Sequence, residues 1–255
     1  MATKTGPKQA APTKKADGQQ AALPKKTDTQ QAALPKKTGA RPERAAEKSV
    51  SRQIVFDPTE DRTTIANQAA SDPAILAALA ENLSIDARRV RQFSAAALNV
   101  LSERQPQLLV PFIAQLADAL HRPEAQTRWE SLEALCRLAP LDPAACDAAL
   151  SGAEISLYDE ESGPTRLAAL RFLTVYGALD ARRSTKVWPL IDEALQCYHG
   201  DAEFQDMLVC VIAFAGGRTS KDVRRALAAR MDFDAKHNKG VLRKRAAQII
   251  EICER

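Results

Sequence analysis

A long internal repeat constrains the fold of this chain more than any other feature of its sequence. A column of polar residues recurs at nearly constant spacing; its members are Arg91, Arg128, Arg166, Gln205 and Arg243. Apolar residues follow each of them at offsets of four, seven and ten, and at offset seven they are Leu98, Leu135, Leu173, Ile212 and Ile250. These offsets lie on one stripe of an α-helix. Stripes at nearly constant spacing predict stacked helix pairs that share one continuous core.

Helical spacing of apolar residues extends over the whole of residues 58–254. Aromatic residues make up only 5% of the chain, and no segment alternates as a β-strand would. Asp57-Pro58-Thr59-Glu60 is typical of a helix start, with Asp at the N-cap and Pro in the first turn. The sequence therefore predicts an all-α chain, with helices over 58–70, 73–83, 86–103, 106–121, 124–139, 143–157, 163–179, 184–199, 201–215, 220–231 and 236–254.

The unit that runs from Leu108 to Leu138 resembles a HEAT repeat of the armadillo-like superfamily. A proline in the first helix, an acidic residue in the loop and a Val-Arg pair entering the second helix recur in that family. Pro111 and Pro189 match the proline, Asp86 matches the loop residue and Val90-Arg91 matches the pair, whereas Phe204-Gln205 departs from it. The resemblance covers residues 72–255. It implies a right-handed α-solenoid of about five HEAT-like helix pairs, preceded by a capping segment with one helix at residues 49–71.

The same resemblance implies a structural role for the arginine column. Each arginine is expected to bond carboxylates or carbonyls of the loops in its own or the adjacent repeat, so that a ladder runs along the stack. The residues concerned are Arg91, Arg128, Arg166 and Arg243.

Residues 1–48 contain a second repeat, of eleven residues. Gln19-Gln20-Ala21-Ala22-Leu23-Pro24-Lys25-Lys26-Thr27 recurs as residues 30–38. Proline interrupts any helix, and one leucine per repeat offers too little apolar surface to offset the entropy of ordering. We expect a disordered basic tail. It is either a linker or an arm that binds nucleic acid or another acidic surface.

Charge is divided unevenly along the chain. Residues 1–50 carry a net charge of +7, residues 51–215 carry −9, and residues 216–255 carry +6. Such asymmetry favours a polyanionic partner, or a tail that folds back onto its own acidic body. The candidate polyanion-binding residues are Lys14, Lys15, Lys25, Lys26, Lys36, Lys37, Lys221, Arg224, Arg225, Lys244 and Arg245.

Chemistry-bearing patterns are sparse, so we expect no catalytic residue, no cofactor and no bound metal. Cys197, His199 and Cys210 are the nearest to a metal-binding set, and they lack a fourth ligand at a recognisable spacing. The acidic run at residues 159–161 precedes a helix, where it complements the helix dipole. The sequence holds no GxSxG, P-loop, GxGxxG or HExxH motif.

These observations favour a non-catalytic scaffold or adaptor that binds a protein partner. An alternative from a different class is a nucleic-acid-associated protein that uses the tail and the last repeat. A lower alternative is a HEAT-like DNA glycosylase, for which Trp129 and Trp188 with Asp206 or Asp159 are the only candidates. The five cysteines without CxxC spacing and the absence of a long apolar run predict a cytoplasmic protein with no membrane span. The oligomeric state stays open.

Overall fold

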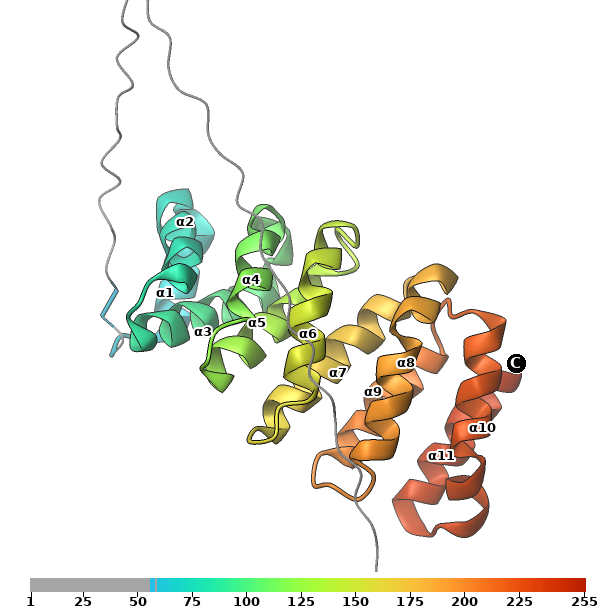
Figure 1. Cartoon of the computed structure of the whole chain (residues 1–255). Coiled ribbons are helices and arrows are strands. Elements are labelled where there is room, and N and C mark those ends of the chain that lie inside the picture. Colours follow the sequence, from blue (N-terminus) through green and yellow to red (C-terminus); the bar gives the residue numbers. More distant parts are fainter. Residues whose placement is uncertain (1–55, 58) are drawn as a thin grey trace, which may run out of the picture. The chain divides into compact units, whose positions relative to one another are not determined.

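The computed structural model describes residues 56, 57 and 59–255. The predicted tail of residues 1–48 lies outside the described residues. Within the described part all regular structure is helical (Figure 1). The α-helices are α1 (Arg62–Ser71), α2 (Pro73–Glu81), α3 (Arg88–Arg104), α4 (Ile113–Ala119), α5 (Ala125–Leu138), α6 (Leu150–Leu157), α7 (Gly163–Gly177), α8 (Ala181–Cys197), α9 (Phe204–Ala215), α10 (Lys221–His237) and α11 (Gly240–Glu254).

The helices stack in two layers. The odd-numbered helices α1, α3, α5, α7, α9 and α11 pack successively on one another, and the even-numbered helices cover one side of them. Five helix pairs, from α2–α3 to α10–α11, thus follow the capping helix α1. The predicted all-α solenoid of five helix pairs is confirmed. None of the helices in the described residues is long and apolar enough to span a bilayer.

The first helix begins later than the sequence predicts. Asp61, not Asp57, is the N-cap of α1, since its carboxylate accepts the backbone N–H of Thr64 at 2.9 Å. Asp57 accepts the backbone N–H of Thr59 instead, two residues along the chain. Asp57 and Asp61 can both cap a helix. Asp61 is the cap because the apolar stripe of the helix begins at Ile65.

The segments predicted as helices over 106–121 and 143–157 each start as a 3₁₀ helix, at Pro106–Phe112 and Ala145–Ala149. Pro111 lies within the first of these and provides no backbone N–H, which accounts for the tighter start there. Helix α10 in turn runs to His237, six residues beyond its predicted end.

Core packing follows the predicted stripe through the first three repeats and leaves it in the last two. Leu98, Leu135 and Leu173 are fully buried. In α9 the buried stripe starts one residue earlier than predicted and comprises Phe204, Leu208, Val211 and Phe214. In α11 it contains Ala246 and Ile249 rather than Ala247 and Ile250.

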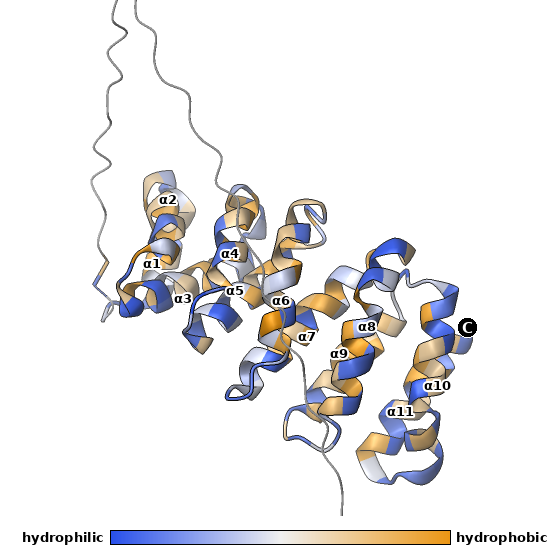
Figure 2. Cartoon of the chain, in the orientation of Figure 1, coloured by the Kyte–Doolittle hydropathy of each residue, from blue (hydrophilic) through white to orange (hydrophobic). Residues whose placement is uncertain are grey.

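The shift arises because Phe204, rather than Gln205, has the place of the ladder arginines in the repeat. Phe204 is 2% exposed, whereas Gln205 is only half-buried. The interval between Arg128 and Arg166 recurs between Arg166 and Phe204 in α9. It recurs again between Phe204 and Leu242 in α11. The helices carry both hydrophobic and hydrophilic residues (Figure 2).

Candidate functional site

A ladder of arginines lies along the loops that precede the odd-numbered helices. Arg91 donates from Nε to Glu124 at 3.2 Å and from Nη1 to the carbonyl of Ile85 at 2.5 Å. Glu124 belongs to the loop before the next odd-numbered helix, whereas Ile85 belongs to the loop before α3 itself. Each ladder arginine therefore binds its own loop and the following one.

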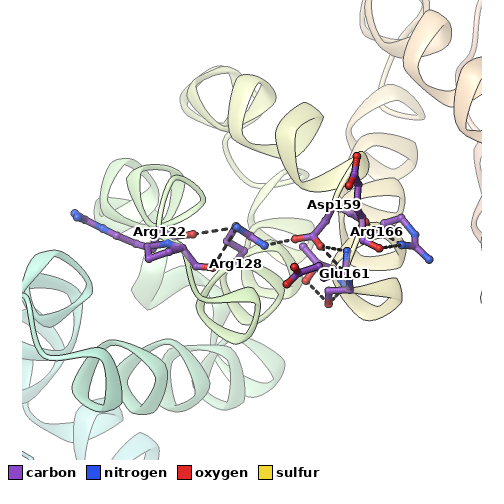
Figure 3. Close-up of polar contacts among 9 residues, drawn as sticks. Arg122, Arg128, Asp159, Glu161 and Arg166 are labelled. Atoms are coloured by element: carbon purple, nitrogen blue, oxygen red, sulfur yellow. Dashed lines mark hydrogen bonds and ion pairs between the residues drawn. The ribbon is translucent and has the colours of Figure 1, made fainter.

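Arg128 and Arg166 repeat this arrangement (Figure 3). Arg128 pairs with the carboxylate of Asp159 and donates to the carbonyl of Arg122 at 3.2 Å. Arg166 donates to the carbonyl of Asp159 at 2.9 Å and to Glu203 at 2.6 Å. The ladder stops after Glu203, because the equivalent position in α9 is Phe204. Arg243 is exposed and has no polar partner among the described residues, so the column does not continue through it.

The carboxylate of Glu124 in the ladder has a lowered pKa. Burial raises the pKa of Glu124, but the hydrogen bonds from Arg91, the backbone N–H of Glu124 and the charges of Arg91 and Arg88 together outweigh it and leave that pKa below its ordinary value. Both side chains are nearly inaccessible, at 9% for Arg91 and 5% for Glu124. A buried pair whose partners satisfy each other positions the loops. It leaves no free group for a ligand.

A second set of polar pairs closes the outer surface of the odd-helix layer, which we call the odd-helix face. Between α3 and α5, Arg137 donates to Asn99 at 2.9 Å, and Asn99 donates to Glu130 at 2.6 Å. Between α5 and α7, Arg171 pairs with Glu133. These contacts bridge neighbouring helices, so the face is polar and closed over its first half.

Between α7 and α9 the odd-helix face opens into an apolar groove of about 490 Å³. Val209 has the position in α9 that Glu133 and Arg171 have in α5 and α7, and it is 48% exposed. The groove is lined by Arg171, Thr174, Val175, Ala178, Leu179, Asp206, Val209, Cys210, Ala213 and Phe214. No ion pair of the described chain bridges α7 and α9.

Two close approaches shape the groove. A Cβ atom on Gly177 would lie 2.6 Å from Val187 and 2.8 Å from Phe214, so only glycine lets α8 and α9 pack this closely on the end of α7. Phe214 then forms part of the groove lining while remaining fully buried. At the rim, Arg171 and Asp206 provide one charge of each sign.

The sequence missed the groove because the predicted stripe placed Val209 in the core. The signal that could have found it is the regularity of the repeat. A column drawn through Arg128, Arg166 and Phe204 is evenly spaced, and it puts Val209 in the same row as Glu133 and Arg171.

The basic candidates of the last two helices divide into separate groups. Lys221, Arg224 and Arg225 line one pocket with residues from the end of α11. Lys244 is exposed near the start of α11, whereas Arg245 is held by the backbone carbonyl and side chain of Gln205. The six lysines of the predicted tail lie outside the described residues.

Cys197, His199 and Cys210, which come nearest to a metal-binding set in the sequence, belong to no potential metal group among the described residues. His199 bonds Asp234 at 3.0 Å, and its ring lies 4.9 Å from that of Phe204. In the part of the chain that the structure describes, no group of three or more His, Cys, Asp or Glu side chains could hold a metal ion. Trp129 and Trp188 are half-buried against the core on different helices, and Asp159 is taken up by the ladder.

Comparisons with known proteins identify the fold. No protein-family model matches the chain, and no curated protein does. A designed armadillo repeat protein in complex with the peptide (KR)4 superposes with a TM-score of 0.63 at 15% identity, over 75% of this chain and 90% of that one. A second designed armadillo repeat protein gives 0.61 at 15% identity, with the same coverage of both chains. An engineered protein gives 0.59 at 18% identity, over 77% and 87%.

Proposed function

We propose that this armadillo-like α-solenoid is a non-catalytic scaffold that binds an extended peptide segment of a partner protein on its odd-helix face. The observation that carries the proposal is the apolar groove between α7 and α9. Contiguous apolar surface that remains open to solvent in a folded protein is typical of an interaction site. Cytoplasmic action, which the unpaired cysteines suggest, is part of the proposal.

The chemistry of the groove defines the peptide that it suits. Val175, Val209 and Ala213 offer contacts to one aliphatic or aromatic side chain. Asp206 is exposed on the rim and forms no ion pair within the described residues, so a basic residue next to that apolar anchor is favoured. The peptide in the complex of the designed armadillo repeat protein supports an extended segment as the class of partner.

A nucleic-acid-associated function is less well supported by the folded part. A duplex needs a continuous track of free cations, whereas the basic residues here are divided between two places on the last two helices. That alternative now depends on the tail lysines. A glycosylase would need aromatic side chains and a free carboxylate around one cleft, and the described residues do not supply that arrangement.

Selection from a random peptide library on the full chain tests the proposal. A selected peptide should carry an apolar anchor, and its fluorescence polarisation should give the affinity for each variant. We expect Val209→Lys to weaken binding at least about tenfold, because it places a charge in the groove. Ile155→Lys is the matched control, since Ile155 is 57% exposed on the even-numbered helix α6.

Cys210 provides a local readout, because its thiol lines the groove. Burial raises its pKa, so alkylation should be followed at alkaline pH with site-resolved mass spectrometry. Bound peptide should slow the alkylation of Cys210 and leave that of the exposed Cys197 unchanged. Peptides that bind equally well to Val209→Lys, or that leave Cys210 unprotected, would contradict the proposal.

A further inference from the structure

Arg224 repeats the local geometry of the ladder in a different place. Arg91, Arg128, Arg166 and Arg224 are each the fourth residue of their helix. Each also donates to a backbone carbonyl of the loop just before that helix. For Arg224 the acceptor is Gly217, at 3.0 Å, and a second bond runs from Nε to the hydroxyl of Thr219 at 3.1 Å.

One component of the ladder motif is missing at Arg224. The three ladder arginines each bind a carboxylate from a later loop, namely Glu124, Asp159 and Glu203. Arg224 forms no ion pair within the described residues. Its guanidinium is held in place by two neutral acceptors, and its charge has no counter-charge in contact.

The uncompensated charge lines an open pocket of about 420 Å³. Lys221, Arg225 and Ala228 of α10 line it with Arg224, and Cys253, Glu254 and Arg255 face them from the end of α11. Lys221 is exposed and forms no ion pair in the described chain. Arg225 is 81% exposed and makes only a 3.4 Å contact with the equally exposed Asp222. Two exposed cations therefore flank one fixed cation.

We propose that this pocket binds an acidic segment of a partner protein. One carboxylate of that segment binds the Nη1 side of the Arg224 guanidinium, because Nε and Nη2, through which the ladder arginines bind their carboxylates, already donate to Thr219 and Gly217. A planar guanidinium held at one edge presents its remaining N–H groups in a geometry that suits a carboxylate. Lys221 and Arg225 then neutralise neighbouring acidic residues of the segment.

The distribution of charge favours an acidic peptide over nucleic acid. Glu254 faces the pocket and Asp222 lies on its border, so the cations there do not form an uninterrupted positive surface. Arg218, which is exposed and forms no ion pair in the described chain, lies three residues before Lys221, whereas Arg243 and Lys244 lie about ten residues before the pocket on α11, roughly 15 Å along the helix. A phosphate backbone would find no continuous track from the pocket to Arg243 and Lys244. This inference does not depend on the groove between α7 and α9.

The test uses the full chain and a fluorescein-labelled polyglutamate peptide, with polyglutamine of equal length as the neutral control. Lys221→Gln with Arg225→Gln should weaken polyglutamate binding at least about tenfold at low salt. Arg243→Gln with Lys244→Gln removes the same charge from the same two-helix unit and should change binding less than about twofold. Val209→Lys should leave it unchanged, which separates this site from the groove.

Cys253 reports occupancy of the pocket directly. Burial raises the pKa of its thiol above the ordinary value, so alkylation is again measured at alkaline pH. Polyglutamate should slow the alkylation of Cys253 in the natural sequence and not in Lys221→Gln with Arg225→Gln. Because tail lysines also attract polyglutamate, protection of Cys253 is the decisive readout rather than total binding.

Several results would overturn the inference. Equal weakening by the two double variants, or loss of binding only on replacing Lys25, Lys26, Lys36 and Lys37 with Gln, would show diffuse electrostatic attraction. Stronger protection of Cys253 by an oligothymidylate than by polyglutamate would make the pocket a nucleic-acid site. Arg224→Gln should abolish protection as well, and a circular dichroism spectrum establishes whether that variant folds.

Discussion

Removing one partner of the buried pair between Arg91 and Glu124 should cost more stability than removing both. Arg91→Met leaves the carboxylate of Glu124, 5% exposed, without its counter-charge. Breaking a pair this deeply buried costs about 3–5 kcal/mol of unfolding free energy, whereas apolar replacement of both partners is often close to neutral. We therefore expect Arg91→Met to destabilise the chain by that amount, and Arg91→Met with Glu124→Leu to recover most of the loss.

Urea unfolding followed by circular dichroism measures these free energies, and a double-mutant cycle gives the coupling. Arg225→Gln is the control, because Arg225 and its neighbour Asp222 are 81% and 91% exposed. A pair this exposed contributes about 0–1 kcal/mol. The reasoning would be refuted if Arg91→Met cost no more than Arg225→Gln, or if the double variant were the least stable of the set.

The pH dependence of the same pair has a definite sign. Because the pKa of Glu124 is lowered in the folded chain, its contribution is present above the unfolded value of about 4.3 and is lost as pH falls through the folded pKa. In Arg91→Met the buried carboxylate loses the bonds that lowered its pKa, so protonation then relieves the unpaired charge. The stability difference between Arg91→Met and the natural sequence should shrink as the pH is lowered from 7 towards 4.

Leu135→Ala and Leu173→Ala should each cost about 2–5 kcal/mol in urea unfolding, because both side chains are fully buried. Leu141→Ala, at a residue 44% exposed, should cost much less, and equal costs would contradict the core assignment. Gly177→Ala should cost about 1–3 kcal/mol, since the new Cβ atom would lie 2.6 Å from Val187, whereas in Gly216→Ala the nearest atom lies 3.6 Å away, which makes it the control. Deletion of residues 1–48 should leave the melting temperature nearly unchanged at low and high salt, and a large decrease would show that the tail supports the fold. If the tail binds duplex DNA, engagement of ~5 phosphates gives a slope of log K against log salt near −4.5, and replacing Lys25, Lys26, Lys36 and Lys37 with Gln should flatten it for all DNA sequences alike.

The sequence by itself determined the class of fold and the number of helix pairs. Apolar residues at offsets of four, seven and ten define a helical stripe locally, and a stripe that recurs at nearly constant intervals can be buried only by stacking. Capping chemistry predicted the start of α7, which the hydroxyl of Ser162 caps, but not that of α8, which begins at Ala181 after the cap Asp180, three residues before its predicted start. Where two candidate caps lie close together, as Asp57 and Asp61 do, only packing of the adjacent apolar stripe selects one.

Tertiary structure decided the parts that bear on function. Gln205 continues the polar column in the sequence, but Phe204 is the buried residue at that place in the repeat, so the buried stripes of α9 and α11 start one residue earlier than predicted. In this register Val209 lies outside the core and lines the groove, and only the even spacing of the repeat through Phe204 indicates this in the sequence. The sequence also could not predict that Arg224 has no ion-pair partner, because it does not show which arginines and carboxylates come into contact. Periodicity specifies which face of a helix is buried, whereas pairing across repeats depends on distances that only the packed array fixes.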